Sequence, residues 1–357
     1  MWSQCVAVPQ KKITHYKIFK KIILTLHSSN GYLTSQMKIF MLIVVTTLMV
    51  SFTFTSSASS FDGPLQIKNQ FPLFLHINTP YLESASAENS FSASLSHSSV
   101  YMLRNSSRWS VQLDMEISEL DIRFRKKISD SLEFGIDVPV LSFNSGFMDN
   151  FLESYHKAFG FPDYGRSDRP VNEFLYEVRR NGKLVVKGKD GEIGIGDIRL
   201  AVKKVILNSP AISLMATIEL PTGKSSGGFG NGSLDGGVAV LIEHELSRKI
   251  KVYFNSGAVI SGDLKAEKNV KLKNFVYAGT GFEAFLWDNL SVLGQIYAQS
   301  SVFPKTKIST IDRTPLILTL GGRYYSGKSS IEFSFTEDPN TSGAPDLTFG
   351  LSYKRKF

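Results

Sequence analysis

Hydrophobic and polar residues alternate with a period of two from Phe91 to the end of the chain. The last segment shows the pattern clearly, with one side formed by Leu347, Phe349, Leu351, Tyr353 and Phe357. Only Arg355 interrupts this side. Such alternation is typical of strands that have one face in an apolar medium and the other in a polar one. We therefore expect an all-β protein.

Twelve strands can be placed from this pattern. They cover residues 90–102, 109–128, 131–141, 193–207, 211–220, 236–246, 250–261, 274–286, 290–302, 315–325, 329–337 and 346–356. Turns of two or three residues alternate with longer connections rich in Gly, Lys, Asn and Pro. A soluble β-sandwich has the same periodicity, but short turns alternating with long loops favour a transmembrane up-and-down antiparallel β-barrel. With both termini in the periplasm the strand number is even, and about twelve satisfies this.

One strand departs from the simple pattern. Its apolar phase runs from Trp109 to Ile117 in steps of two and then resumes at Leu120, one position out of step. A β-bulge at Ser118 and Glu119 would shift the phase within one long strand, whereas a hairpin there would make the strand number odd. We expect the bulge.

The longest connection, residues 142–192, contains the clearest helical pattern. Phe147, Phe151, Tyr155 and Phe159 recur every four residues, which predicts an amphipathic helix in an external loop. Loops this long commonly serve as lids, constrictions or binding elements. The loop is expected either to gate the lumen or to cap the barrel mouth, and the sequence favours neither.

Several charged residues of this loop are candidates for a lumen or gate site. Asp149, Glu153 and His156 share one helix face and could hold a cation, although a solvated charged face has the same spacing. Arg166 and Arg169 could contact lipopolysaccharide phosphate or guard a pore, or could pair with nearby carboxylates. We expect neither a metal nor a cofactor.

The N-terminal part of the chain has the composition of a leader. Residues 37–60 carry a basic start, an apolar stretch of about sixteen residues and small residues at Ser56-Ser57-Ala58, as in a signal peptide. The stretch is shorter than the roughly twenty residues of a membrane-spanning helix, so an anchor is the weaker interpretation. Residues 1–36 are then an upstream extension with Met37 as the start, and residues 61–89 a periplasmic or lumenal segment preceding a barrel over 90–357.

Composition narrows the function further. The 357 residues are 42% hydrophobic and carry a formal charge of +8, of which six charges are lysines before residue 59. The remaining +2 gives no electrostatic footprint for nucleic acid. The single cysteine, Cys5, lies in the segment expected to be removed, so disulfide or thiolate chemistry is not expected.

His97 and Ser99 are the candidate catalytic residues. They lie two positions apart and share a strand face. The pair resembles the His-x-Ser arrangement of outer-membrane phospholipase A, which implies a lipid-facing serine activated by histidine. An Asn at the matching site of the next strand is missing, and Asn105 is a poor substitute. A chance occurrence in a serine-rich stretch is the favoured explanation.

Four motifs resemble an uncharacterised proteobacterial outer-membrane family, a domain of unknown function, over essentially the whole mature chain. They are Gly63-Pro64-Leu65-Gln66-Ile67-Lys68-Asn69-Gln70, Ser145-Gly146-Phe147-Met148-Asp149, Phe159-Gly160-Phe161-Pro162 and Leu220-Pro221-Thr222-Gly223. The last motif is also similar to one found in outer-membrane barrels associated with uptake of apolar compounds. The resemblance implies a barrel in the outer membrane of a Gram-negative bacterium and no particular activity.

The polar side of the predicted strands suggests a lumen. Glu283, Gln295, Arg323 and Glu332 all fall on it. We expect a pore or transporter for a small solute, gated by the 142–192 loop; the alternatives are a lipid-modifying, phospholipase-like enzyme and a structural or partner-binding barrel. Expected partners are outer-membrane lipid, lipopolysaccharide, the solute, and the barrel-assembly machinery acting through the C-terminal Phe357.

Overall fold

The computed structural model describes residues 61–357 except 76, 161–163 and 341. The predicted signal peptide and the upstream extension lie outside the described residues. Twelve strands form the wall of a closed antiparallel barrel. They are β1 (Ser90–Asn105), β2 (Trp109–Ser129), β3 (Leu132–Asn144), β7 (Ile198–Asn208), β8 (Ala211–Leu220), β9 (Asp235–Ser247), β10 (Ile250–Ile260), β11 (Phe275–Trp287), β12 (Leu290–Gln299), β13 (Leu316–Ser326), β14 (Ser329–Glu337) and β15 (Leu347–Lys356).

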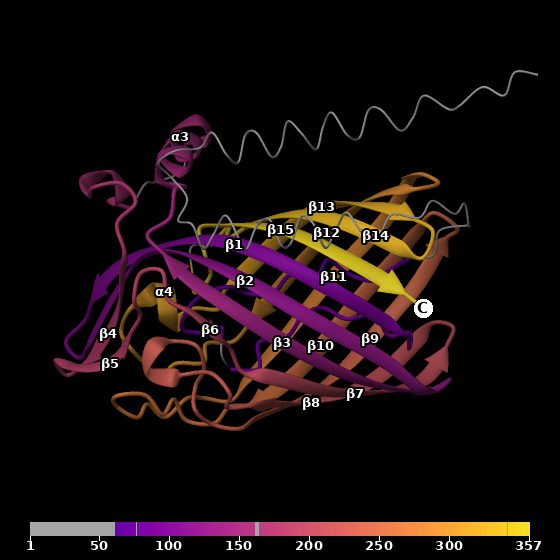
Figure 1. Ribbon diagram of the computed structural model, residues 1–357, viewed down its shortest axis with the longest axis horizontal. Helices are drawn as coiled ribbons and strands as arrows, with labels where there is room; N and C mark the ends of the chain where they lie inside the picture. Colours follow the sequence, from indigo (N-terminus) through magenta and orange to yellow (C-terminus); the bar gives the residue numbers. More distant parts are fainter. Residues whose placement is uncertain (1–60, 76, 161–163, 341) are drawn as a thin grey trace, which may run out of the picture. The chain divides into compact units, whose positions relative to one another are not determined.

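Each wall strand pairs with its neighbour in sequence, and β1 pairs with β15 to close the ring. Closure satisfies every strand edge, so the wall needs no covering layer. Figure 1 shows the long connections gathered at one end of the barrel and the C-terminus at the other. The short elements are α3 (Asp149–Phe159), η1 (Arg166–Asp168), β4 (Leu175–Arg180), β5 (Lys183–Lys187), β6 (Ile193–Ile195), η2 (Ser225–Gly227) and α4 (Ser309–Asp312).

The twelve-strand barrel and the helix in the 142–192 loop are confirmed. Two details of that region differ from the prediction. The strand expected at 193–207 is divided into β6 and β7 at Gly196 and Asp197. The hairpin of β4 and β5 pairs with β2 and was not expected at all. Within the described residues, no helix has the length and apolarity needed to cross a membrane.

The predicted bulge in β2 is wrong. The pairing of β1 with β2 keeps one register from Ser90↔Arg125 to Asn105↔Ser110, without a shift. The same face of β2 points inward throughout, carrying Trp109 near one end and Arg125 near the other, both buried. What changes along the strand is the environment: the interior is apolar toward the long loops and polar toward the short turns. The apolar phase therefore moves from the inner face to the outer face while the backbone continues unbroken.

A large buried hydrophobic cluster fills the interior at the long-loop end. It combines side chains of wall strands with those of connections and of residues 71–85. Toward the short turns the inward positions are mostly Ser, Thr, Glu, Asp, Arg and Lys, and they are buried as well. Since buried charges need partners, this polar half must contain a dense network of ion pairs.

Candidate functional site

Residues 61–89, which we call the lumenal segment, run through the inside of the barrel. They begin near the short turns, where Asp62 accepts a hydrogen bond of 2.6 Å from the Ser330 hydroxyl. They reach the hydrophobic cluster at the long-loop end with Phe74, which is fully buried. They return to the short turns at Glu88, which lies within 2.6 Å of the Lys354 ammonium group. The segment thus crosses the lumen toward the long-loop end and returns, and in doing so it fills the lumen.

Arg323 holds the beginning of this segment. Its guanidinium donates to the Gly63 carbonyl at 2.9 Å. It also forms ion pairs with Glu283 at 2.7 Å and Glu332 at 2.5 Å. Only 1% of Arg323 is exposed. Two carboxylates therefore balance a buried cation whose remaining donors bind backbone carbonyls of the lumenal segment.

Gln295 and Glu332 bind the backbone of the same segment. The Leu65 N–H donates to Gln295 Oε1 at 3.1 Å, and the Gln66 N–H donates to Glu332 Oε1 at 2.8 Å. These contacts satisfy donors that an irregular chain would otherwise leave unpaired inside the barrel. Glu283, Gln295, Arg323 and Glu332, the four residues predicted for the lumen wall, all lie inside the barrel. They bind each other or the lumenal segment and do not line an open lumen.

A second charged cluster surrounds the returning limb. Arg125 donates to Glu83 at 3.2 Å, and Arg123 also pairs with Glu83. Arg199 joins the cluster through Asp137. Two of its N–H groups donate to the same oxygen of this carboxylate, at 2.6 Å and 2.9 Å. Three arginines and two acids thus form one buried network that joins β2, β3, β7 and the lumenal segment.

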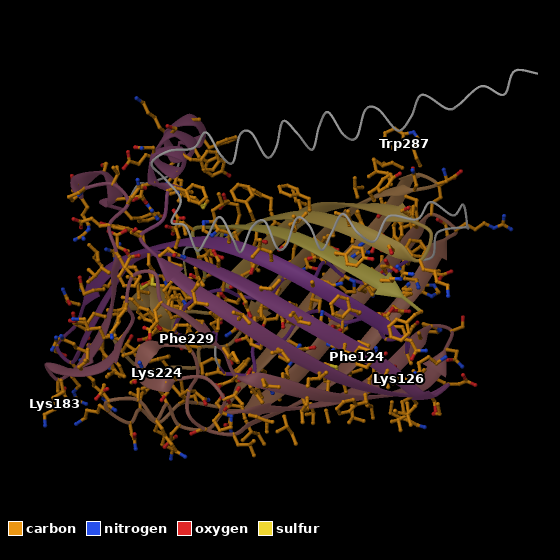
Figure 2. The ribbon with its side chains drawn as sticks, in the orientation of Figure 1. Phe124, Lys126, Lys183, Lys224, Phe229 and Trp287 are labelled. Carbon is orange, nitrogen blue, oxygen red and sulfur yellow. The ribbon has the colours of Figure 1, made fainter. Side chains whose placement is uncertain are left out.

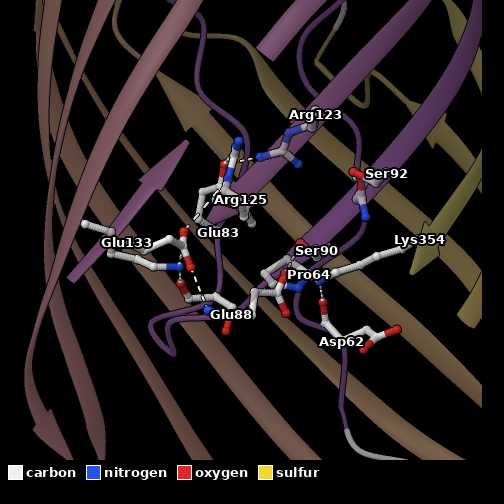
Figure 3. A pocket seen from close by; sticks show the side chains of 14 residues that line it. Asp62, Pro64, Glu83, Glu88, Ser90, Ser92, Arg123, Arg125, Glu133 and Lys354 are labelled. Carbon is white, nitrogen blue, oxygen red and sulfur yellow. Dashed lines mark hydrogen bonds and ion pairs between the residues drawn. The ribbon is translucent and has the colours of Figure 1, made fainter. Parts of the chain in front are cut away.

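Figure 3 shows the space that remains among these charges. The cavity is lined by Asp62, Glu88 and Lys354 on one side and by Arg123 and Arg125 on the other, and its volume is about 30 Å³. That volume holds about one water molecule. At this level of the described lumen, the lumenal segment and the charged side chains thus leave a cavity of about the size of one water molecule.

Side chains of the 142–192 loop cover part of the interior at the long-loop end. The β4–β5 hairpin places Tyr176 against Phe143, with ring centroids 5.4 Å apart in an edge-on arrangement. Phe143 in turn packs on Phe229 at 4.7 Å. Val185 and Val186 of the hairpin are buried in the same hydrophobic cluster. This part of the 142–192 loop therefore covers the long-loop end of the interior.

The Leu-Pro-Thr-Gly motif closes the break between β6 and β7. The Thr222 hydroxyl donates to the Gly196 carbonyl at 2.7 Å, and the Gly223 N–H donates to Asp197 at 2.8 Å. A Cβ on Gly223 would lie 2.1 Å from the Phe229 carbonyl oxygen, which excludes any larger residue without movement. The motif has a structural role at this position: it supplies hydrogen bonds where the wall ladder is interrupted.

Helix α3 lies on the outer surface of the barrel. Phe151 packs on Phe349 at 6.2 Å, and Tyr155 packs on Phe335 at 6.3 Å. Phe335 and Phe349 alternate with buried inward residues on β14 and β15 and therefore point outward. Figure 1 shows α3 beyond the outer side of β1. Within the loop that was expected to gate the lumen or cap the barrel mouth, the helix is attached to the outer side of the wall.

The predicted gate residues of this loop join it to the wall. Arg166 forms ion pairs with Asp149 and Asp346, and Arg169 pairs with Asp114 at 2.8 Å. The pair with Asp149 lies within the loop, whereas Asp346, just before β15, and Asp114 of β2 connect the loop to the wall. Both arginines are thereby engaged with local carboxylates.

Glu153 and His156 lie on the same helix, whose buried side includes Leu152. Glu153 is half-buried and His156 is 8% exposed. Their positions on α3 are outside the lumen. Asp149 is turned toward Arg166, so the three residues do not converge on one point.

His97 and Ser99 are not brought together. His97 Nε2 lies 2.7 Å from Glu116, and its Nδ1 lies 2.8 Å from the Ser118 hydroxyl. Ser99 instead accepts a hydrogen bond of 3.2 Å from Arg166. The two residues share the outward face, as their spacing requires, but each is engaged with a different partner.

The buried arginines of β2 were not named as site residues from the sequence, although the residue pattern indicates their position. Arg123 and Arg125 alternate with Ile122 and Phe124, so they occupy the polar, inward positions of a barrel strand. The lumenal segment combines many apolar residues with three prolines and no alternation, which indicates buried irregular chain rather than a wall strand.

Comparisons place the chain among proteins of this architecture. A family model described as "Protein of unknown function (DUF3187)" matches residues 39–357. No curated protein matches the chain. The COG4313 outer membrane channel from Pseudomonas putida F1 is 13% identical, with 76% of this chain and 96% of that chain covered and a TM-score of 0.50.

Two further solved structures have lower scores. The CymD monoaromatic hydrocarbon channel is 13% identical over 83% of this chain and 95% of its own, with a TM-score of 0.39. The Pseudomonas putida toluene transporter TodX is 9% identical over 76% and 90%, with a TM-score of 0.37. At these identities the likeness concerns the barrel fold.

Proposed function

Because the chain belongs to the DUF3187 family, whose description assigns no activity, we propose from its own geometry that it is a small-solute channel of the outer membrane of a Gram-negative bacterium. The outer surface supports this location. Large apolar side chains are exposed on the outward positions of the wall, including Ile122, Phe124, Phe134, Val202, Leu214, Ile218, Val238, Phe254, Val276, Phe282, Ile296, Leu320 and Phe333. A continuous apolar belt of this kind is stable in lipid and unfavourable in water.

Charged residues lie at the two ends of this belt. Figure 2 shows Lys183 and Lys224 at the end with the long loops, and Lys126 and Trp287 toward the other end. Amphipathic and cationic side chains are favoured at membrane interfaces. The distribution suits a barrel that crosses one bilayer with its long loops outside.

The observation that carries the channel proposal is the lumenal segment. It is not a wall strand, and charged or polar side chains of the wall hold its backbone at Gly63, Leu65 and Gln66. The segment can leave the lumen without breaking any strand pairing. Its departure would expose a polar interior lined by Glu283 and Arg323, as expected of a solute path.

Gating is assigned chiefly to the lumenal segment. The β4–β5 hairpin is the part of the 142–192 loop that contributes a second closure, because its side chains cover the mouth. Helix α3 lies on the outside, and the contacts of this part of the loop with the wall include the Arg166–Asp346 ion pair and the aromatic contacts with Phe335 and Phe349. Opening therefore requires movement at both ends of the interior.

Membrane partners follow from the surface. Phe357 is 52% exposed and stacks on Phe124 of the outer wall, with ring centroids 6.0 Å apart. An accessible terminal aromatic at the short-turn end suits recognition by the barrel-assembly machinery. Arg166 and Arg169 are paired with carboxylates, so lipopolysaccharide contact is assigned to the exposed lysines of the long-loop end instead.

The test is single-channel conductance in a planar bilayer. The full mature protein is compared with a variant in which residues 65–87 are replaced by a short Gly-Ser linker and with a matched variant lacking helix α3 (150–159). Closed behaviour of the full protein, discrete steps from the first variant and closed behaviour of the second are expected. Folding is checked by heat-dependent mobility in gel electrophoresis.

A folded variant without residues 65–87 that stays silent would contradict the channel and favour a structural or partner-binding barrel. Should the linker variant fail to fold, Gln295→Ala with Glu332→Ala weakens the same contacts with the segment present. Brief openings of this double variant, absent from the full protein, are then the expected result, and their absence would refute the proposal.

A further inference from the structure

A second, larger cavity lies at the long-loop end of the molecule. Its volume is about 240 Å³, and it is bounded by the end of β1, the connection that contains α4, the connection between β14 and β15, and the tip of the lumenal segment. This is room for about eight water molecules at roughly 30 Å³ each. The cavity is distinct from the charged space of Figure 3, which lies among residues nearer the short turns.

One part of the cavity wall is apolar. Phe71 of the lumenal segment contributes a fully buried ring, and Met102 and Ala344 are also buried. The Tyr101 ring completes this side, with its hydroxyl engaged by the Gly165 carbonyl at 2.7 Å. Such a surface favours the hydrocarbon part of a ligand.

The other part of the wall is cationic. Arg104 and Arg313 both line the cavity. Among the residues that the structure describes, neither guanidinium forms an ion pair with a carboxylate. Among the described residues of the lining, the acid is Asp346, and Arg166 neutralises it. Two cationic side chains, Arg104 half-buried and Arg313 exposed at the rim, therefore stand beside an apolar wall.

We propose that this cavity binds a small organic anion: a carboxylate attached to an apolar group, of about eight to ten non-hydrogen atoms in all. The planar guanidinium groups suit a carboxylate, which they can bind through paired N–H donors. The volume lies below the roughly 300 Å³ at which drug-sized pockets begin, so it matches a small monocarboxylate more closely than a fatty acid.

The location connects this site to the closure of the barrel. Phe71 belongs to the lumenal segment, and the Asn69 side chain two residues earlier donates to the Gly343 carbonyl at 2.8 Å. A ligand in the cavity therefore touches the element that fills the lumen. This inference rests on the proposed channel when the anion is regarded as the solute, but binding itself does not require conduction.

The test is equilibrium binding of benzoate to the refolded full-length mature protein in detergent, measured by isothermal titration calorimetry. Benzyl alcohol, which has the same ring without the charge, is expected to bind at least tenfold more weakly. Arg104→Gln combined with Arg313→Gln is expected to lower the affinity for benzoate at least tenfold. The matched control is Arg108→Gln with Lys305→Gln, which removes one exposed cation from the turn after β1 and one from the connection that contains Arg313, and is expected to change affinity less than twofold.

Failure of folded wild-type protein to bind benzoate would overturn the site. Equal binding of benzyl alcohol would overturn the anionic ligand class. Equal losses of affinity in the two double variants would show that benzoate responds to the overall positive charge of this end, which would overturn the assignment to Arg104 and Arg313. Because the lumenal segment stays in place, a protein that never conducts can still pass this test. Conduction without benzoate binding would refute only this inference.

Discussion

The guanidinium of Arg323 donates to the carbonyl of Gly63 at 2.9 Å across 260 residues of sequence. This contact joins β13 of the wall to the beginning of the lumenal segment. The same guanidinium is neutralised by Glu283 and Glu332, so it can remain charged inside the barrel. Wall and lumenal segment thus share one buried charge network, and the stability of the barrel is coupled to its closure.

Replacing Arg323 with Met is expected to lower the free energy of unfolding by about 3–5 kcal/mol, because it leaves two buried carboxylates without their partner. Urea titration in detergent, followed by tryptophan fluorescence, measures the change. Arg355→Met is the control: Arg355 is exposed on β15, and its replacement should change the free energy of unfolding by less than about 0.5 kcal/mol. Equal effects of the two substitutions would mean that the network contributes nothing specific.

Asp197 is expected to make stability depend on pH. Burial raises its pKa to about 6, although backbone N–H groups of Gly223 and Asn231 oppose this shift. Since the folded pKa lies above the unfolded one, the stabilising contribution is complete below about pH 4 and is lost as the pH rises through 6. Unfolding free energies measured between pH 4 and 8 should fall with pH in the wild type.

Asp197→Asn should make that dependence less steep, because the amide does not titrate. Asp190→Asn on the exposed surface of the preceding loop is the matched control and should retain the wild-type slope. A slope unchanged in Asp197→Asn would assign the pH effect to other groups.

Glu116→Gln is expected to loosen α3 without opening the barrel. The carboxylate accepts the Phe147 N–H at 2.8 Å and also binds His97 and the Met148 N–H. Removing its charge should cost about 1–3 kcal/mol of local stability. Faster amide hydrogen exchange over 145–159, with β1 and β15 unchanged, is the expected signature.

Lys157→Gln, on the exposed side of α3, should leave this exchange at the wild-type rate. If exchange over 145–159 is identical in Glu116→Gln and wild type, then the aromatic contacts of α3 and the ion pairs of Arg166 hold the loop in place without Glu116.

Leu120→Arg tests the change of environment along β2. Leu120 points outward within the apolar belt, while Gln112 points outward beyond it. An arginine on the lipid face costs about 2–4 kcal/mol near the bilayer midplane. Refolding into lipid vesicles should therefore be less favourable for Leu120→Arg by about this amount, and Gln112→Arg should behave as the wild type. Equal effects would show that both positions meet the same surroundings.

Residue alternation predicted most of the wall, because each wall strand meets two different media and its sequence must satisfy both. The strand at 211–220 agrees with β8 at both ends, and the turn at 326–328 separates β13 from β14 as expected. The same reasoning was misleading in β2, since it assigned a change of phase to a bulge. Periodicity reports which residues are apolar and does not report which medium lies on which side.

The chain by itself therefore determined the barrel, its strand number and the helix of the long loop, because these depend on local periodicity and turn chemistry. Only the tertiary structure decided what fills the lumen. The residues that meet there, such as Gly63 with Arg323 or Glu83 with Arg125, are far apart in sequence and follow no shared pattern. The position of α3 was likewise decided by packing, since an amphipathic face fits the outward Phe335 and Phe349 as well as it would fit a lumen.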